Sequence, residues 1–538
     1  MNKTDKVIVV GGGMSGLTAT AYLARAGKSV KLFEKSHKFG GLVNSYERNG
    51  FIFDGGIRSI EDSGILFPML RDLNIKMEWV KSNVSIGLED DILKLKDKSS
   101  LIDYESFLKR HFPNSRDDIE NIMNTIKKVM SYMDVLYGIE NPLFMNLKEN
   151  PYYAFKVILP WFSKYIFTVN KILKMNEPVD DYIVRLTSDI QLKDNIIQHF
   201  FKKTPAFFAL SYFSLYLDYH YPKGGTGKLP EKIEEMARKA GANLIVNNGI
   251  ESLNPEKKYV IDSNGEKHFY DKLLWAADLK TLYRSIPVRE IKRKKLTQII
   301  NNKNEELEDL LGGDSVLSLN ISVDLDRSYF SNICSEHFFY TPDATGMSTV
   351  DTGGIESVLK SKHITNPQRA KQIIKDYLCE FFKMNTYEIS IPVLRDETLA
   401  PKGKTGLIIS TLFDYQLAKL IKDMGWYDEF MTFTENCMIQ ALTNSVYPEL
   451  KENIIDQFSS SPLSIEKWTS NTQGAITGWA FTNDHMPVIN KITGMFSAVD
   501  TPLPHIYQAG QWSYSPSGLP IAILSGKRAA DKIIKSLK

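Results

Sequence analysis

A glycine-rich turn between two short apolar strands is the feature that most constrains how this chain can fold. Residues 7–10 give an apolar strand pattern that runs directly into a turn with spaced glycines, residues 11–16. An Ala-rich helix pattern follows over residues 17–26, and a second strand pattern over residues 30–33 ends at Glu34. A glycine motif between two strands, with an acid at the end of the second, predicts a Rossmann-type dinucleotide-binding unit.

Each part of this turn has a role in holding a dinucleotide. Gly11 permits the tight turn, Gly13 lets the backbone approach the pyrophosphate, and Gly16 lets helix and strand pack closely. The start of the helix offers unpaired N–H groups and a positive dipole end to phosphates. Glu34 stands where a carboxylate accepts a hydrogen bond from a ribose hydroxyl. The motif alone does not distinguish between dinucleotides.

Further glycine-bearing blocks identify the type of cofactor. Gly40-Gly41 is followed by the segment GFIFDGG at residues 50–56, then YPKGGTG at residues 221–227 and a long block over residues 506–530. These blocks resemble those of FAD-binding flavoproteins related to amine oxidases and phytoene desaturases, and they occur in the same order. The resemblance therefore implies FAD rather than NAD as the tightly held cofactor.

The resemblance also implies which residues hold FAD. Ile250 matches the family position that touches the adenine, and the terminal block lies against the flavin ring. The terminal block has no Cys or His that could form a covalent flavin link, so we expect non-covalent FAD. The predicted cofactor-binding residues are Gly11, Gly13, Met14, Ser15, Gly16, Glu34, Lys35, Gly40, Gly41, Gly56, Ile57, Arg58, Ile250, Ala276, Gly510, Gln511, Gly518, Leu519 and Pro520.

The resemblance covers nearly the whole chain and is closest to bacterial phytoene-desaturase-like and carotenoid-isomerase-like proteins. It implies an α/β fold, in which a non-contiguous Rossmann-type FAD-binding domain carries an inserted α+β substrate domain and an aromatic-rich helical region. We expect the FAD-binding domain at residues 1–75, 218–283 and 487–538. The helical lid, a candidate membrane-contact region, is expected at residues 76–217, and the substrate domain at residues 284–486.

Composition limits the partners and the compartment. At 538 residues the chain should form two or more domains. Its 66 Lys and Arg residues nearly balance 64 Asp and Glu residues, which gives no basis for nucleic-acid binding. The three cysteines form no CxxC or metal-binding pattern, so we expect no metal and a cytoplasmic protein with reduced cysteines. No run approaches the roughly 20 apolar residues of a membrane-spanning helix, and no signal peptide precedes the first strand. The oligomeric state is left open.

The stretch 152–174 differs from the rest in composition. It crowds aromatic and aliphatic residues together, and Pro160 should kink its helix. An apolar face beside a basic stripe is typical of a helix lying on an anionic bilayer, which would place the protein at the inner face of the membrane. An ordinary helix with its lysines in water gives the same pattern, so both interpretations stay open. The stripe consists of Lys156, Lys164, Lys171 and Lys174.

Arg58 is the candidate for substrate anchoring. Many carotenoid desaturases have Gly-Pro after the FD motif, whereas this chain has Gly56-Ile57-Arg58-Ser59. A hydrocarbon has no use for a guanidinium, but a substrate carboxylate would pair with it bidentately. A structural salt bridge and a contact to FAD are the alternatives. Gln511-Trp512 and Ile521 also depart from the family pattern, and these differences put a carotenoid substrate in doubt.

Three functions remain open. The first is an FAD-dependent oxidoreductase that desaturates or saturates carbon–carbon bonds of a long polyene, isoprenoid or fatty acid. The second is an FAD-dependent isomerase of double bonds, and the third is a flavin amine oxidase. The chain has no GxSxG, HExxH or CxxC motif, so the flavin should carry the chemistry. The nine histidines are scattered, and we interpret each as a surface or core residue. No catalytic residue is identified.

Several local elements are also predicted. Residues 272–275 and 388–394 have strand patterns, and residues 317–325 alternate apolar and polar residues as a half-buried strand does. Residues 416–442 are largely helical with a break at Gly425, and Pro520 suits the first turn of a helix. The glycine-bearing segment 474–479 resembles the family's loop near the substrate.

Overall fold

The N-terminal strand forms the centre of a parallel sheet in the computed structural model, which describes residues 6–145, 150–361, 364–489 and 492–537. All of its strand pairs are parallel, and they come from three distant parts of the chain. Near-continuous apolar runs suit such a sheet because both of its faces are covered. In spatial order the strands are β10 (Asn243–Ile245), β2 (Ser29–Phe33), β1 (Lys6–Val10), β14 (Lys272–Trp275) and β20 (Ile506–Gln508).

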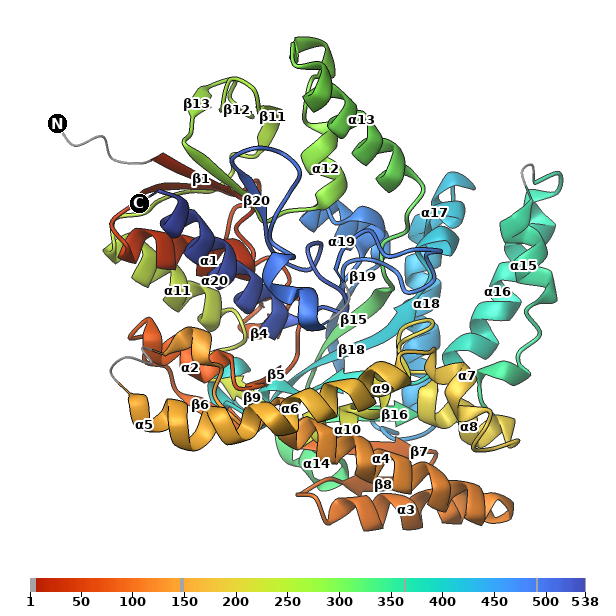
Figure 1. Cartoon of the computed structure of the whole chain (residues 1–538). Helices are drawn as coiled ribbons and strands as arrows, with labels where there is room; N and C mark the ends of the chain where they lie inside the picture. The colour runs from red at the N-terminus through yellow and green to blue at the C-terminus, as the bar shows by residue number, and fades with distance from the viewer. Residues whose placement is uncertain (1–5, 146–149, 362–363, 490–491, 538) are drawn as a thin grey trace.

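The five-stranded sheet lies between two layers (Figure 1), and alternate residues of β1 belong to two different cores. Val7 and Val9 belong to a core formed with three helices, whereas Ile8 and Val10 belong to a second core that includes residues of a small antiparallel sheet. The first layer contains α1 (Met14–Arg25), α11 (Lys228–Lys239) and α20 (Leu519–Ser536), and the second contains β11 (Ile250–Asn254), β12 (Tyr259–Asp262), β13 (Lys267–Phe269), α12 (Leu279–Arg284) and α13 (Lys294–Glu308). The Rossmann-type prediction is confirmed.

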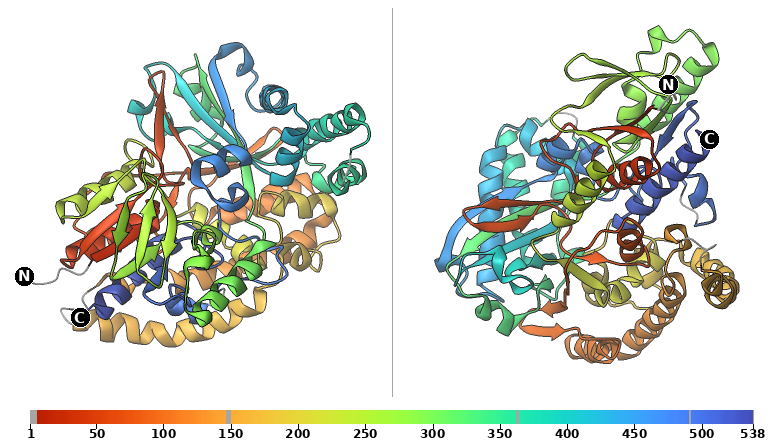
Figure 2. Two further views of the ribbon diagram at one scale, coloured as in Figure 1. Left: turned by 90° about the horizontal axis from the view of Figure 1, so that it is seen from above. Right: turned by 90° about the vertical axis from the view of Figure 1, so that its left-hand side faces the viewer.

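A mixed seven-stranded sheet forms the second half of the molecule (Figures 1 and 2). Three helices, α16 (Pro367–Met384), α17 (Tyr415–Asp423) and α18 (Tyr427–Thr443), pack with it in one core. Gly425, with φ +79°, separates α17 from α18, as expected. The strands in order are β19 (Ile454–Ser460), β15 (Ser315–Val323), β18 (Thr405–Phe413), β17 (Tyr387–Ser390), β16 (His337–Thr341), β7 (Val84–Leu88) and β8 (Asp91–Lys94).

The polar residues of β15 do not face solvent, although the alternating pattern of its sequence is typical of a strand with one exposed face. Alternating polar residues predicted a half-buried strand, yet Ser318 and Asn320 are buried like their apolar neighbours. Leu317 and Leu319 face the helix-covered core, while Ser318 and Asn320 line an internal cavity. The polar face is therefore shielded by the rest of the molecule.

The aromatic-rich region is largely helical, as expected, but it begins with strands. β7 and β8 lie within residues 76–217, where we expected a helical lid, and they instead extend the seven-stranded sheet through a parallel pairing of β7 with β16. The division into domains stays a prediction. The helices are α3 (Ser100–His111), α4 (Arg116–Leu136), α5 (Pro151–Tyr153), α6 (Leu159–Ile172), α7 (Val179–Ile183), α8 (Ile190–Ile197), α9 (Ala206–Leu210) and α10 (Tyr212–Tyr216).

A π-helical turn, Ala154–Ile158, joins α5 to α6, and Pro160 lies in the first turn of α6. Pro160 cannot donate a backbone hydrogen bond, which is tolerated at the start of a helix. The long helical element runs along the outside of the molecule in Figures 1 and 2. None of the helices in the described residues is both long and apolar enough to span a bilayer.

Candidate active site

A cavity of about 1730 Å³ lies between the two sheets and the long helix α6. Its lining comes from the glycine turn after β1, from the open face of the seven-stranded sheet, and from the start of α20. In parallel α/β sheets ligands bind outside the carboxyl ends of the strands, and that edge of the five-stranded sheet opens into this cavity.

The structure brings the predicted cofactor residues together. Every one of them except Gly16 lines the cavity, although they come from segments up to 500 residues apart. Gly16 instead lies beneath the turn, where a side chain would overlap the carbonyl oxygen of Gly11. Their role in binding FAD stays a prediction, because a shared wall does not identify its ligand.

Gly11 and Gly13, the first two glycines of the GxGxxG motif, differ in what surrounds them. Gly11 has φ +97°, and a Cβ there would lie 2.8 Å from the carbonyl oxygen of Ala276, so no larger residue fits. A Cβ on Gly13 would meet no protein atom within 4 Å and would project into open space beside the cavity. The space at Gly13 fits a group that approaches the backbone closely, as a pyrophosphate does.

Two helices start at the cavity with uncapped N-termini. α1 has Gly13 as its N-cap, with no side-chain cap and no acid in its first turn. α20 has Gly518 as its N-cap, again without a side-chain cap, and carries Pro520 in its first turn as predicted. Free N–H groups and the positive end of the helix dipole suit a diphosphate at one helix and an electron-rich ring at the other.

Glu34 is held at the end of β2 by the backbone around it. Its Oε2 accepts a hydrogen bond from the N–H of Gly12 at 2.7 Å, and its Oε1 accepts one from the N–H of Ser36 at 2.8 Å. These bonds fix the carboxylate at the cavity edge, where each oxygen keeps a further lone pair. The neighbouring Lys35 donates to Ser470, and burial lowers the pKa of Lys35.

Arg58 is buried, and its donors are used by neutral groups. One terminal nitrogen donates to Ser410 Oγ at 2.6 Å and to Ser318 Oγ at 3.2 Å, and the other donates to the Gly56 carbonyl. Nε is buried without a hydrogen-bond partner. Within the described residues no carboxylate forms an ion pair with Arg58, so the salt-bridge alternative finds no support in the described structure.

A polar row crosses the cavity face of the seven-stranded sheet. Ser318 pairs with Ser460 on one side and with Ser410 on the other, and Ser410 pairs with Glu388. All four residues line the cavity. Residues opposite one another on neighbouring strands project from the same face, so Arg58 spans the middle of this row and Glu388 ends it.

His337 contacts Glu388 on the neighbouring strand. Its Nε2 lies 3.0 Å from Glu388 Oε1, and its Nδ1 lies 3.0 Å from Ser59 Oγ. His337 is buried, whereas 35% of the Glu388 side chain is exposed. One carboxylate oxygen of Glu388 therefore lies against the imidazole, and because Glu388 lines the cavity the group stays open to a ligand. Arg395 donates to Ser59 and Ser82 behind this pair.

The carboxyl groups in this wall have pKa shifts in opposite directions. Burial raises the pKa of Glu388, but His337, Arg58 and Arg395 outweigh it, and the net shift is downward. Burial also lowers the pKa of His337. Glu61, which lines the same cavity, has its pKa raised to about 7 by burial and by the charge of Asp218. At neutral pH Glu388 is therefore ionised, His337 is neutral, and Glu61 is partly protonated.

Sequence reasoning did not single out Glu388 or His337. We placed Glu388 in a strand and treated the histidines as ordinary core or surface residues. Glu388 was detectable in one respect: Tyr387 and Ile389 are apolar and Glu388 lies between them, so the acid marks the opposite face of a buried strand. The pairing with His337 depends on strand order, which periodicity does not reveal.

The remaining wall is apolar and aromatic, and it forms the side of the cavity opposite the sheet. Such a wall suits a long lipophilic ligand. Among its residues are Ile158, Trp161, Phe162, Tyr165, Phe207, Phe208 and Tyr212. The glycine-bearing loop expected near the substrate contributes Ile476 and Thr477.

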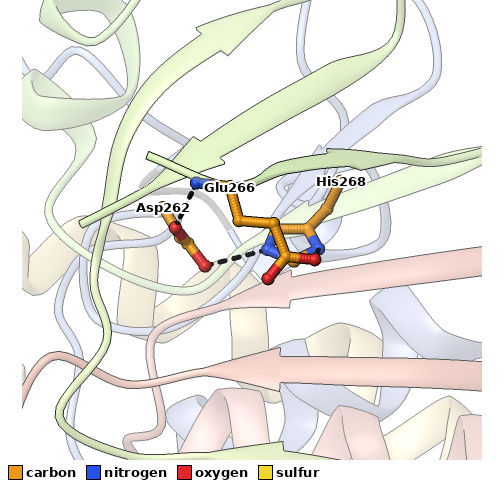
Figure 3. Close-up of side chains that lie close together, drawn as sticks. All are labelled: Asp262, Glu266 and His268. Carbon is orange, nitrogen blue, oxygen red and sulfur yellow. Dashed lines mark hydrogen bonds and ion pairs between the residues drawn. The ribbon is translucent and has the colours of Figure 1, made fainter. Parts of the chain in front are cut away.

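Asp262, Glu266 and His268 form a separate cluster on the small antiparallel sheet (Figure 3). Asp262 accepts hydrogen bonds from Asn248 and from the N–H of Glu266, and it lies 2.9 Å from His268 Nε2. Burial opposes ionisation of Asp262, but these contacts outweigh it and lower its pKa to about 2. The ammonium of Lys31 lies 3.5 Å from His268 Nδ1. The contacts stabilise the hairpin, and a nearby ammonium disfavours a metal ion.

Comparisons with known proteins agree with this architecture. A sequence-family profile described as an NAD(P)-binding Rossmann-like domain matches residues 9–73. The 4,4'-diapophytoene desaturase (4,4'-diaponeurosporene-forming) of Staphylococcus aureus strain COL is 21% identical over 573 aligned positions, with 99% of each chain covered. The expected resemblance to phytoene desaturases is confirmed.

Solved structures share the fold at lower identity. Putrescine oxidase bound to putrescine has a TM-score of 0.58 and 14% identity, with 99% of both chains covered. A putative protoporphyrinogen oxidase from Exiguobacterium sp. 255-15 has a TM-score of 0.56 and 14% identity, again with 99% of both chains covered. These neighbours support a two-part fold common to several oxidases, without indicating a substrate.

Proposed function

We propose that this chain, a full-length homologue of the 4,4'-diapophytoene desaturases, is an FAD-dependent oxidoreductase that desaturates carbon–carbon bonds of a long lipophilic polyene. One observation carries the proposal. A single cavity is bordered by the glycine turn with two uncapped helix N-termini and, at its other side, by an aromatic wall. A dinucleotide fits the first part, and an elongated apolar molecule fits the second.

The residues present fit FAD. The turn at Gly13 and the start of α1 would hold the pyrophosphate, Glu34 the ribose, Ile250 the adenine, and the start of α20 the flavin ring. A bound flavin would supply two-electron redox chemistry. The protein's own contribution is to exclude water through the aromatic wall and to orient the substrate between that wall and the polar row. We further propose that FAD is non-covalent, so denaturation should release it intact.

Mass spectrometry of the lipid product tests the function. Purified protein with FAD, incubated with 4,4'-diapophytoene in liposomes and an electron acceptor, should yield a product with two fewer hydrogens for each new double bond. A product of unchanged mass and altered double-bond geometry would instead identify an isomerase. Conversion of putrescine to an aldehyde, with no change in the polyene, would identify an amine oxidase.

Redox-neutral isomerisation is the second candidate, and one observation favours it. Glu388 and Glu61 lie in the same cavity with pKa shifts in opposite directions. Pairs of this kind commonly divide the roles of acid and base. Moving a double bond requires one group that removes a proton and another that returns one, and these two carboxyl groups could do both.

We also propose that the long helix contacts an anionic membrane. Apolar side chains on its outer face are strongly exposed: Tyr152 is 72% exposed, Phe155 69% and Phe167 71%. Other residues of the same helix, including Trp161 and Tyr165, line the cavity. The helix therefore separates the cavity from the outside, and its exposed lysines would attract anionic lipid headgroups. A lipophilic substrate could then pass from the bilayer to the cavity without crossing water.

A further inference from the structure

We propose that Glu388 is the catalytic base that accepts the proton removed from the substrate, and that His337 is a positioning residue that holds its carboxylate. This inference rests on the proposed function and adds a named residue to it. It derives from the placement of Glu388 at the end of the polar row, where a carboxylate faces a largely apolar cavity.

The position of Glu388 is set by the sheet. Tyr387 and Ile389 are fully buried in the core on the other face, so the pleat directs Glu388 into the cavity. His337 Nε2 lies 3.0 Å from Oε1 of Glu388, and the other ring nitrogen of His337 lies 3.0 Å from Ser59 Oγ. A base that is fixed on one side and open on the other keeps one oxygen available for a proton on the substrate.

The charges around Glu388 keep it ready to accept a proton. A carboxylate in an apolar cavity is costly unless it is paired, so its persistence in the ionised form needs an explanation. Arg58 and Arg395 supply positive charge without forming an ion pair with it, and neutral His337 supplies a contact. The other titratable groups that face Glu388 are His199, Tyr212, Tyr216 and Tyr219.

Desaturation requires such a base. Forming CH=CH from a CH2–CH2 unit breaks two C–H bonds, one on each carbon, and one hydrogen leaves as a hydride with its electron pair. A bound oxidised flavin, the cofactor of the proposed function, would supply the two-electron acceptor for this hydride. The other hydrogen leaves as a proton to Glu388, and its bonding pair becomes the π bond. Loss of the hydride leaves positive charge on the substrate, and this charge makes the C–H bond on the neighbouring carbon acidic. A carboxylate with a lowered pKa is therefore basic enough to remove that proton, and it also stabilises the positive charge.

Glu61 is the rival base in the same cavity. Its raised pKa of about 7 leaves it partly protonated at neutral pH. The structure gives Glu61 no partner comparable to His337 within the described residues, and no arginine lowers its pKa. The same isosteric change at both positions therefore provides a matched comparison.

The test compares Glu388→Gln, Glu388→Asp and Glu61→Gln as FAD-loaded proteins with 4,4'-diapophytoene in liposomes. We expect Glu388→Gln to lower the single-turnover rate by roughly 10²–10⁴-fold, with normal FAD content and normal perturbation of the flavin spectrum by the bound polyene. Glu388→Asp should recover part of the rate, and Glu61→Gln should lower the rate far less than Glu388→Gln does. A wild-type rate in Glu388→Gln, or a loss confined to Glu61→Gln, would overturn the assignment.

Two pH titrations test the role of His337. Activity should need ionised Glu388, so the rate should fall only when the pH drops below the ordinary carboxyl range of about 4. His337→Leu removes a contact that favours the ionised form and should move this acid limb upward, whereas His337→Gln should restore it. An infrared titration without substrate follows the carboxyl band of Glu388, identified as the band that is missing from Glu388→Gln. The pKa read from this band should be higher in His337→Leu than in wild type and in His337→Gln. An unmoved limb in His337→Leu would contradict the positioning role.

The outcomes separate this inference from the proposed function. If wild-type protein forms no desaturated product, the proposed function fails, and the base assignment fails with it. If wild-type protein desaturates the polyene and Glu388→Gln does so equally fast, only the base assignment fails.

Discussion

The glycine turn and the polar row are built in opposite ways, although both border one cavity. The turn is made of backbone: φ +97° at Gly11, open space at Gly13, and helix N–H groups that no side chain caps. The polar row is made of side chains from four strands, with Arg58 reaching in from a loop. A site made of backbone leaves a local motif in the sequence, whereas a site made of paired side chains exists only once the strands are in order.

The largest expected effect separates two glycines three residues apart. Gly16→Val should destabilise the FAD-free protein by more than about 3 kcal/mol, because its side chain would overlap the backbone of Gly11. Gly13→Val should cost only about 1 kcal/mol as an N-cap change, since nothing lies within 4 Å, yet it should abolish FAD binding. Thermal unfolding without FAD and flavin content measure the two effects. A yellow Gly13→Val protein would show that the pyrophosphate does not lie at this turn.

Substitution of Arg58 tests whether the polar row binds a charged group of the substrate. If it anchors a carboxylate, Arg58→Met should weaken binding of a fatty acid by roughly 2–5 kcal/mol while a neutral polyene binds as before. Equilibrium binding of the two lipids to the FAD-loaded protein measures this. Loss of FAD from the variant would assign Arg58 to the cofactor site instead. Equal binding of the fatty acid to both proteins would show that no carboxylate is read.

The long helix extends the comparison from the cavity to the surface. Changing Lys156, Lys164 and Lys171 to Glu should weaken binding to anionic liposomes by roughly 100-fold or more, at about 1 kcal/mol per lysine. Co-sedimentation with anionic and neutral liposomes measures it, and added salt should weaken the wild-type binding. A matched control reverses three exposed charges in and just before α13, which lies apart from α6 at the top of Figure 1: Lys292, Lys294 and Lys295. Equal losses of liposome binding in both variants would show that the long helix makes no specific contact with the membrane.

The smallest expected effect lies at the start of α20. Ile521→Asp places a carboxylate in the first turn, where it offsets a dipole end worth about 0.3–2 kcal/mol. Because about 1.4 kcal/mol corresponds to roughly 30 mV for a two-electron couple, the FAD midpoint potential should fall by up to a few tens of millivolts. Ile521→Asn is the uncharged control, and spectroelectrochemistry compares the two. An equal shift in both variants would mean that Ile521 only packs.

The sequence predicted the backbone-built parts with little error. β14 begins and ends where expected at Lys272 and Trp275, and Pro520 lies in the first turn of α20. These elements carry their own signals, namely apolar runs, glycine positions and a proline at a helix start. An exposed aromatic surface on the long helix was one of the two interpretations that its sequence left open.

The side-chain-built parts could not be predicted in the same way. The alternation in β15 was correct as a strand pattern but wrong about solvent, because a polar face can border a cavity as well as water. The row from Ser460 to Glu388 depends on which strands are neighbours, and strands β17 and β18 lie far along the chain from β15. The residue pattern within a strand does not show which distant strand will lie beside it.

Anaerobic reduction of the bound flavin by the lipid tests the central claim most directly. Wild-type protein carrying oxidised FAD is mixed with 4,4'-diapophytoene in liposomes without oxygen or another acceptor, and the visible flavin absorbance is followed. We predict that the band bleaches in a single turnover, with one new double bond formed for each flavin reduced. A flavin that stays oxidised while the polyene changes geometry, or does not change, would contradict the account.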